Sequence, residues 1–424
     1  MKKLLVVILG LIVIFMTFLY WSVLSTNSAD QQSLLLNLDN VETINFKDYD
    51  SVIIAASTLY KANTIKTVIQ GEQYRKAWET PIKVPVVFLD TLFGGVSITK
   101  EGGGKQTHSL KLLCTNNIQY TLRGINKDPE ALIPDLLKTL SLENIVVDGI
   151  SAQHPYGAIL AAELATYANV LSTHPKVVFV PKQSVLGEEY NEKYGNRLFL
   201  LEYETESDTN WTDLDRVESI IESDDLQELK QKYNDSVYID ERQLVRSRLF
   251  DLIIGDWDRH AKQWGWVMQR NNGKLKGVPI PGDRDNAFFK AEGLIPTLLS
   301  NENVVPRLRP FQEQIKFMPG LVYPFDRYFL LKTPESVFIE EAKALQSLLT
   351  DANIEAAFKV WPKAISELDE KEIKRTLIKR RNDIVKYAIE FKKEIERKGG
   401  LTEPLKGSED VELSENLKHC FSCE

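Results

Sequence analysis

The stretch GDWDRHAKQW at positions 255–264, followed by PIPGDRDNAF at positions 279–288, contains the residues that decide the fold. Apolar residues recur at helical spacing before Gly255, which predicts a buried helix that ends there. Asp258 then falls in the loop just past this helix. At such a position the backbone can expose a carboxylate to a ligand.

A hairpin is predicted between the two pieces. Apolar and polar residues alternate over 264–267, an Asn-Asn-Gly turn follows at 271–273, and a second short strand leads to Asp283 and Asp285. A kinase needs such a layout. One Asp orients and deprotonates a hydroxyl, an amide oxygen binds a metal, and a second Asp completes a Mg²⁺ site.

Known kinase families share these patterns. The run DRHAKQ at 258–263 is similar to the Asp-x-His-Ala-Lys-Asn catalytic loop of HipA-type serine kinases. The run DRDNAF at 283–288 resembles the Asp-Asn-Gly-x-x-Phe metal loop of type II phosphatidylinositol 4-kinases and of secretory-pathway protein kinases.

The resemblance implies roles for the residues of both loops. Asp258 would be the catalytic aspartate, in a catalytic loop that also contains His260. Asp283 would bind Mg²⁺ or Mn²⁺, with Asp285 as a supporting acid. Gln263 would take the place of the metal-binding Asn, which is a departure from the family pattern because its amide oxygen lies one methylene further from the backbone.

Three other interpretations of these acids stay open. Asp and Asn favour helix caps and turns, so a purely structural role is one of them. A kinase fold without kinase activity is the second. The third is a metal-dependent hydrolase, which has the weakness that only one His is in range. Its ligands would be Asp256, Asp258, His260, Asp283 and Asp285.

A phosphate clamp is predicted upstream, in the run EGGGKQT at 101–107. Glycines lack a Cβ, so their backbone N–H groups can approach phosphate oxygens. The flanking segments 96–99 and 109–113 are strand-like, which favours a glycine-rich hairpin over a strand-to-helix P-loop. The run loosely resembles the Gly-x-Gln-x-Lys-type loop of HipA-like kinases, and a plain hairpin turn is the alternative. The candidate phosphate-binding residues are Gly102, Gly103, Gly104 and Lys105.

The strand predicted at 119–123 carries the cation that would pair with the nucleotide phosphates. The family pattern has Lys there, whereas this chain has Arg123, with Lys127 as the other candidate. Arg is permanently charged and can bind phosphate in a bidentate manner, but with a different geometry from Lys. A helix predicted at 155–168 has one acid, Glu163, which either pairs with one of these cations or faces solvent.

The remaining segments complete a two-lobed domain. The run RLFLLEY at 197–203 looks like the hinge strand that borders an adenine pocket, which makes Glu202 a candidate nucleotide-binding residue. A strand is also predicted at 176–180 and helical structure at 213–233. Later helices are predicted at 334–349, at 351–368, and from about 369 to Gly399.

Together these elements predict an α+β, two-lobed, protein-kinase-like fold behind a transmembrane helix. The predicted organisation is an N-terminal lobe at 30–205, a mainly helical C-terminal lobe at 206–400 and a disordered tail at 401–424. The chain has 424 residues, of which 43% are hydrophobic and 26% charged, enough for a sizeable core. A net charge of −8 and the lack of a basic tract argue against a nucleic-acid partner.

The N-terminus predicts an uncleaved membrane anchor within residues 1–29. Two lysines precede a nearly unbroken apolar run from Leu4 to Leu24, and about 20 such residues cross a bilayer. Lys2 and Lys3 favour a cytoplasmic N-terminus, so the main domain would be extracytoplasmic, and periplasmic in a bacterium. Such compartments hold little ATP, so the donor there would be imported nucleotide or another phosphoryl donor.

The expected activity is ATP- and Mg²⁺- or Mn²⁺-dependent phosphate transfer to a hydroxyl of a protein, a lipid or a small molecule. An inactive kinase-like binding module of the cell envelope is the alternative. Cys420 and Cys423 form a lone Cys-x-x-Cys beside His419, without the second pair that a zinc site needs. Cys114 is expected to be a core residue.

Overall fold

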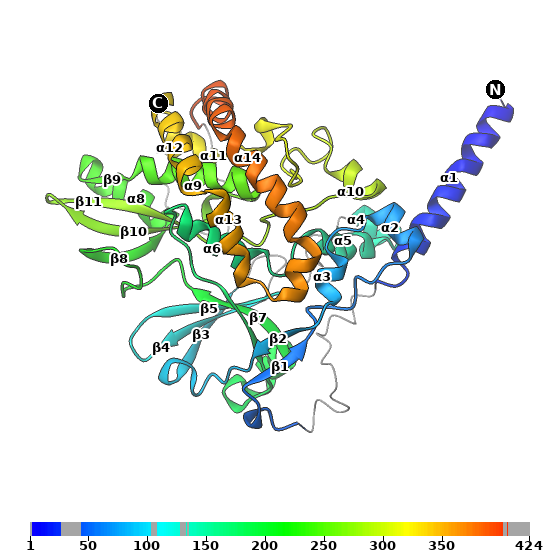
Figure 1. The fold of residues 1–424 in the computed structure, drawn as a ribbon, viewed down its shortest axis with the longest axis horizontal. Helices are drawn as coiled ribbons and strands as arrows, with labels where there is room; N and C mark the ends of the chain where they lie inside the picture. The colour runs from blue at the N-terminus through cyan, green and yellow to red at the C-terminus, as the bar shows by residue number, and fades with distance from the viewer. Residues whose placement is uncertain are drawn as a thin grey trace.

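The computed structural model of the chain describes residues 2–26, 44–102, 108–127, 133, 135–401 and 405. It mixes helices and strands, as expected for an α+β protein. In Figure 1 a five-stranded sheet lies below, most of the helices lie above it, and a four-stranded sheet lies to one side. The predicted residues Gly103, Gly104, Lys105, His419, Cys420 and Cys423 are outside the described part of the chain.

The five-stranded sheet is antiparallel throughout, with the order β3-β4-β5-β7-β6. The strands predicted at 119–123, 176–180 and 197–203 are confirmed. Its members are β3 (Val96–Gly102), β4 (Ser109–Cys114), β5 (Gln119–Gly124), β6 (Lys176–Val180) and β7 (Arg197–Tyr203). Because β3 pairs with β4, the glycine-rich segment joins two strands of one hairpin, as predicted.

A two-stranded sheet and several short helices extend this part of the molecule. The strands β1 (Ser51–Ile54) and β2 (Ile82–Pro85) pair antiparallel, and Val86 bridges to Phe179 of β6. Cys114 is buried in the core of the five-stranded sheet, as expected. The helices are α2 (Thr64–Gln70), α3 (Arg75–Glu79), α4 (Asp135–Thr139), α5 (Glu143–Gly149) and α7 (Gly187–Tyr194).

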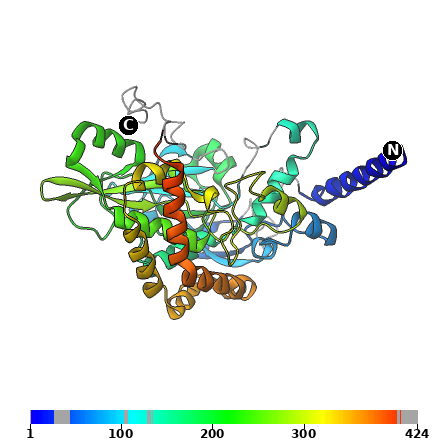
Figure 2. The ribbon, with the colours of Figure 1, turned by 90° about the horizontal axis from the view of Figure 1, so that it is seen from above.

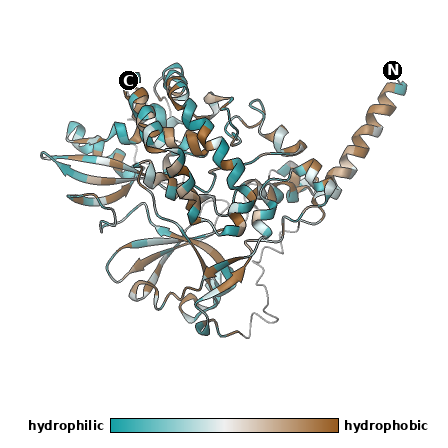
Figure 3. Ribbon diagram, viewed as in Figure 1, coloured by the Kyte–Doolittle hydropathy of each residue, from teal (hydrophilic) through white to brown (hydrophobic). Residues whose placement is uncertain are grey.

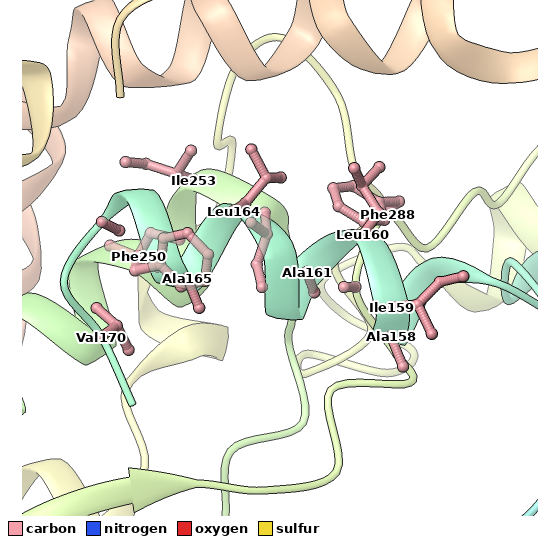
Figure 4. Packing of buried hydrophobic residues seen from close by; sticks show 14 of the residues in the cluster. Ala158, Ile159, Leu160, Ala161, Leu164, Ala165, Val170, Phe250, Ile253 and Phe288 are labelled. Atoms are coloured by element: carbon pink, nitrogen blue, oxygen red, sulfur yellow. The ribbon is translucent and has the colours of Figure 1, made fainter. Parts of the chain in front are cut away.

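Helix α6 (Gly157–Tyr167) is the centre of the core. It matches the helix predicted at 155–168, and most of its residues are buried. Apolar side chains surround it: Phe250 and Ile253 come from a later helix, and Phe288 comes from the predicted metal loop (Figure 4). The helix therefore supports this loop from one side.

The predicted hairpin forms the centre of the four-stranded sheet, whose order is β8-β10-β11-β9. Its turn has positive φ angles at Asn272 (48°) and Gly273 (79°), which tight hairpin turns require. The members are β8 (Val217–Glu222), β9 (Val237–Ile239), β10 (Trp264–Asn271) and β11 (Lys274–Pro281). The prediction of helix over 213–233 was half wrong, because β8 pairs with β10 and the helix α8 (Ser223–Tyr233) begins only after it.

The C-terminal half is mainly helical. Its helices are α9 (Glu241–Ile254), α10 (Leu294–Leu299), α11 (Pro324–Leu330), α12 (Glu335–Leu348), α13 (Asp351–Ala357) and α14 (Lys363–Lys398). The prediction of one helix over 351–368 was wrong, because Pro362 cannot continue a helix and disfavours helical geometry at Trp361. The long helix α14 begins directly after Pro362, earlier than the predicted start near 369, whereas its end before Gly399 is as predicted.

The two ends of the chain differ in their packing. Helix α1 (Lys2–Val23) projects from the body and is apolar along its length (Figures 2 and 3). Among the described residues it is the one helix that is long and apolar enough to cross a membrane. Of its most apolar 18-residue stretch, 6% is buried. At the other end, Leu405 is buried in the main core, so the predicted tail does not begin at 401.

Candidate active site

Helix α9 delivers the loop that contains Asp258. The helix ends at Gly255, whose φ of 72° is the left-handed conformation that favours glycine. The Asp258 backbone N–H donates to Asp256 Oδ1 at 3.3 Å, and its partly exposed carboxylate lies 3.5 Å from Tyr323 Oη. Burial, and then the charge of Asp258, raise the pKa of Tyr323. Tyr323 therefore stays protonated beside Asp258.

A buried network of three arginines and three aspartates holds this loop in place. Its centre is Asp251 on α9, which forms ion pairs with Arg248 Nη1 at 3.0 Å, Arg259 Nε at 3.2 Å and Arg284 Nη2 at 3.1 Å. We call it the arginine–aspartate network; its members are Arg248, Asp251, Asp256, Arg259, Arg284 and Asp326, each at most 5% exposed. Pairing of guanidinium groups with carboxyl groups makes such burial tolerable.

The arginine–aspartate network ties the catalytic loop to the metal loop. Arg259 Nη1 donates to the Gly282 carbonyl at 2.8 Å, and the Gly282 N–H donates to the Gln263 carbonyl at 2.9 Å. Arg284, whose pKa burial lowers, belongs to the metal loop itself. The two loops are therefore fixed relative to each other by buried charge-assisted hydrogen bonds.

The hydrolase alternative loses one of its proposed ligands in this arrangement. Asp256 is 2% exposed, and its Oδ2 lies 3.4 Å from Arg259 Nη1. Burial raises the pKa of Asp256 well above its ordinary value, although the Arg259 charge opposes this. Asp256 is therefore part of the scaffold of the loop, and no group of three His, Cys, Asp or Glu residues that could hold a metal occurs among the described residues.

The metal loop begins with Asp283, which has an unusual backbone. Its φ is 51°, a conformation that non-glycine residues seldom adopt and that is common at functional sites. Asp283 Oδ2 accepts from Arg123 Nη1 at 2.9 Å and from Gln263 Nε2 at 3.4 Å. The predicted metal residues Gln263 and Asp283 are thus brought together, and His260 Nε2 lies 3.5 Å from Gln263 Nε2.

Asp285 lies beside Asp283 and pairs with Lys127. The distance between Lys127 Nζ and Asp285 Oδ2 is 2.5 Å. Burial would raise the pKa of Asp283, but the charges of Arg123 and Lys127 hold it below its ordinary value. For Asp285, burial and then the Asp283 charge raise the pKa to about 6. Close to neutral pH the two carboxylates therefore differ in how readily they take up a proton.

Arg123 is held by two acids from opposite sides. Its Nε lies 2.8 Å from Glu202 Oε1, and its Nη1 reaches Asp283. Glu202 is 5% exposed and also accepts from Thr173 Oγ1 at 2.5 Å. Of the two alternatives for Glu163, the pairing with Arg123 or Lys127 is contradicted: within the described part of the chain, neither cation forms an ion pair with Glu163. Glu202, on the neighbouring strand β7, pairs with Arg123 instead.

These residues line a small pocket with a volume of about 10 Å³ between the five-stranded sheet, α6 and the metal loop. Such a volume holds about one water molecule. The lining combines the charged residues Arg123, Glu202, Asp283, Arg284 and Asp285 with Ala158, Ala162, Ser172, Thr173, Pro175, Leu200 and Pro281.

A divalent cation fits the residues of the metal loop. Asp283 Oδ1 and Gln263 Oε1 are both buried and accept no hydrogen bond in the structure. A buried oxygen without a partner costs free energy, and carboxylate and amide oxygens are ligands that Mg²⁺ accepts. With so few protein oxygens, the rest of the coordination shell would be water and substrate phosphate, as is common for Mg²⁺.

Two predicted elements stand apart from this cluster. No hydrogen bond or ion pair within the described ranges joins the Asp258 carboxylate to Gln263, Asp283 or Asp285. Gly102 ends β3, opposite Ser109, and the neighbouring Glu101 accepts hydrogen bonds from Lys193 and Tyr194. Among the described residues, therefore, no hydrogen bond or ion pair joins the Asp258 carboxylate or Gly102 to the charged cluster.

Comparisons with known proteins give limited similarity. No protein-family model and no curated protein sequence matches the chain. The chain is similar to the proinflammatory kinase CtkA of Helicobacter pylori, with a TM-score of 0.35 and 12% identity, over 68% of this chain and 95% of that chain. It is also similar to a structure of the Shewanella oneidensis toxin–antitoxin system HipA and HipB with operator DNA, with a TM-score of 0.36 and 12% identity, over 70% of this chain and 67% of that chain. Similarities of this size establish neither fold nor function. The function is therefore inferred from the site itself.

Proposed function

We propose that the protein is a membrane-anchored, kinase-like phosphotransferase that uses a metal-bound nucleotide. One observation carries the proposal: Asp283 and the neighbouring Gln263 each have a buried oxygen without a partner, and Asp283 lies beside the Arg123 cation in the lining of a small pocket. Metal ligands, a phosphate-binding cation and an apolar surface for a base are what nucleotide binding by a kinase requires.

Each charged residue then has a role that its position supports. Asp283 and Gln263 would hold Mg²⁺ or Mn²⁺, with Asp285 beside them, and the bound metal would neutralise phosphate charge. Arg123 and Lys127 would bind phosphate oxygens, since they already face the two carboxylates between which phosphates would enter. Glu202 would keep Arg123 oriented towards the pocket.

Asp258 would orient and deprotonate the acceptor hydroxyl. Its carboxylate is partly exposed and belongs to a loop that the arginine–aspartate network fixes against the metal loop. A general base must reach the proton that it removes, and a partly exposed position leaves room for an acceptor. The acceptor would be a hydroxyl of a protein, a lipid or a small molecule.

Membrane anchoring by α1 is supported by how the end of this helix packs. Leu19 and Val23 are buried against the domain, and Thr26 Oγ1 donates to the buried Asp148 at 3.1 Å. Removal of this segment would uncover Asp148 and its partner Lys66, both fully buried. An uncleaved anchor is therefore favoured over a signal peptide, and the two N-terminal lysines favour an extracytoplasmic domain.

A second candidate function is an inactive binding module with a kinase-like fold. The observation that favours it is the ion pair between Arg123 and Asp283, which balances the two charges without a metal or a nucleotide. Gln263 in place of an Asn points in the same direction. Such a module would present the cleft to a partner at the membrane.

Calorimetry on the full-length protein in lipid nanodiscs, with ATP and other nucleotides, separates the two candidates. A phosphotransferase should bind nucleotide only with Mg²⁺ or Mn²⁺. The substitution Asp258→Asn should preserve this binding and lower turnover by about 10²-fold or more. Asp208→Asn changes an exposed acid elsewhere and is the control. Absence of nucleotide binding by the wild type with any divalent metal would leave only the binding module.

A further inference from the structure

The C-terminal end of α1 is rigidly attached to the domain. Leu19 and Val23 pack in one cluster with apolar residues of α2 and α5. Polar contacts add to this: Tyr20 Oη donates to the Leu140 carbonyl, and Lys66 Nζ donates to Thr26 Oγ1 at 2.5 Å. Helix α1 therefore extends the domain as a fixed arm, which sets the position of the domain relative to a membrane that α1 crosses.

The free part of α1 is too short to cross a bilayer alone. Every residue from Leu4 to Phe15 is exposed, whereas Met16 and Leu19 already contact the domain. The stretch from Lys2 to Phe15 rises only about 20 Å at about 1.5 Å per residue, and the hydrocarbon core is about 30 Å thick. The attached end of α1, and the surface of the domain beside it, must then reach the level of the lipid.

Aromatic side chains mark this level on α1. Phe18, Tyr20 and Trp21 are 40%, 37% and 51% exposed, although they lie on the attached end of the helix. Tyr and Trp concentrate at membrane–water interfaces, where the ring contacts lipid and the polar group meets water. Their position indicates that the interface passes through the end of α1 that contacts the domain.

An apolar surface of the domain lies beside this end. Helix α10 packs against α2, where the backbones at Gly71 and Gly293 are in contact, and Ile295 packs against the cluster of Leu19 and Val23. The helix lies on the side of the body from which α1 projects, and its outer side is hydrophobic (Figures 1 and 3). We call this surface the apolar shoulder; it consists of Leu294, Leu298, Leu299, Val304 and Val305, which are 37–58% exposed.

We propose that the apolar shoulder inserts into the membrane interface and forms a second lipid contact besides α1. It is continuous with the attached end of α1, and the length of the free helix requires lipid at this level. Exposed clusters of large apolar side chains mark interaction surfaces. The inference rests on the proposed membrane anchor and specifies how the domain sits on the bilayer.

Lipid-dependent quenching tests the inference on the full-length chain. In a background with Cys114→Ser, Cys420→Ser and Cys423→Ser, a polarity-sensitive fluorophore is attached to a single new cysteine and the protein is placed in vesicles with or without brominated phospholipid. The shoulder variant is Val305→Cys. Its matched control is Val185→Cys, because both valines are 37% exposed and Val185 belongs to the short helical turn Ser184–Leu186, which packs through Leu186 on the core of the five-stranded sheet. Leu9→Cys reports on the anchor.

Brominated lipid should reduce the fluorescence of the labels at positions 9 and 305 and leave that at position 185 unchanged. Quenching at 9 without quenching at 305 would overturn the shoulder contact and leave the anchor intact. Quenching at neither position would overturn both. A label at 305 that is shielded from water but not quenched by the lipid would show that protein, such as a second copy of the chain, covers the shoulder, and this also would overturn the inference.

Discussion

Two buried groups of charges lie only a few residues apart, and they differ in the kind of atom that each leaves without a partner. In the arginine–aspartate network, Asp251 alone pairs with three arginines, and Arg248 forms two further hydrogen bonds with Asp326 at 2.6 and 3.1 Å. In the pocket, Asp283 and Gln263 each keep one buried oxygen without a partner. The network also leaves two buried polar atoms without a partner, Arg259 Nε and Arg284 Nη1, but these are N–H donors, whereas the atoms left over in the pocket are oxygens that can bind a metal.

The difference separates a scaffold from a binding site. A network of paired charges fixes the backbone, because removal of a shared member such as Asp251 leaves opposite charges buried with fewer partners. An incomplete cluster costs free energy in the unliganded protein and recovers it when a ligand supplies the missing partner. The positive φ of Asp283 fits this view, since strained backbone concentrates at sites that bind ligands.

The largest effect on stability should come from removing a charge from the arginine–aspartate network. Asp251→Asn removes the charge that Arg248, Arg259 and Arg284 share, so we expect a loss of about 3–5 kcal/mol of unfolding free energy, the usual cost of breaking a buried ion pair. Urea denaturation of the two proteins measures it. Asp283→Asn is the matched control and should change stability far less. Equal losses in the two variants would remove the distinction between scaffold and site.

The second effect is on ligand binding. Asp283→Ala removes a proposed direct metal ligand, so Mg²⁺-dependent nucleotide binding should weaken by more than tenfold, or more than about 1.4 kcal/mol. Titration calorimetry with and without Mg²⁺ measures this loss. Retained Mg²⁺-dependent binding in this variant would place the metal elsewhere.

The secondary structure around the site was predictable from local patterns. The hairpin of β10 and β11, the strand that carries Arg123 and the helix end at Gly255 all follow from periodicity and turn residues over short windows. The prediction of secondary structure failed where the local sequence and the packing of the sheet favoured different structures. The segment 217–222 forms strand β8 because Ile220 packs against Val267 and Val278 of the sheet, a contact that the local sequence does not specify.

The residues of the candidate site were more predictable from the sequence than the pairs that they form with one another. Both loops were identified by their runs of polar residues, and Gln263, Asp283 and Asp285 came with them. The arginine–aspartate network was missed, because its members come from separate segments, as in the pair of Arg248 and Asp326. A signal was present: two charges, Arg248 and Asp251, interrupt an apolar helix at a spacing of three residues. Such charges need buried partners.

The third prediction concerns the amide at position 263. Gln263 Nε2 reaches Asp283 Oδ2 at 3.4 Å, and the shorter side chain of Gln263→Asn would fall short by about one carbon–carbon bond, about 1.5 Å. Mn²⁺ binding should therefore weaken by about tenfold, as expected for changes that disturb the positioning of a metal ligand. Electron paramagnetic resonance of free Mn²⁺ gives the affinity. Tighter Mn²⁺ binding by Gln263→Asn would mean that Gln263 is a poorer metal ligand than the Asn of the family pattern.

The smallest effect should appear as a pH dependence of metal binding. Asp285 has a pKa of about 6, so it is largely protonated below pH 6 and largely ionised above it, whereas Asp283, with its lowered pKa, stays ionised throughout this range. Because a metal site needs carboxylates without their protons, Mn²⁺ affinity should rise as the pH increases from about 5 to 7, by several-fold and not by orders of magnitude, since one supporting group titrates. Asp285→Asn should bind Mn²⁺ more weakly at pH 7 and lose this pH dependence. A pH dependence that persists in Asp285→Asn would assign it to another group, with His260 the next candidate because it lies 3.5 Å from Gln263.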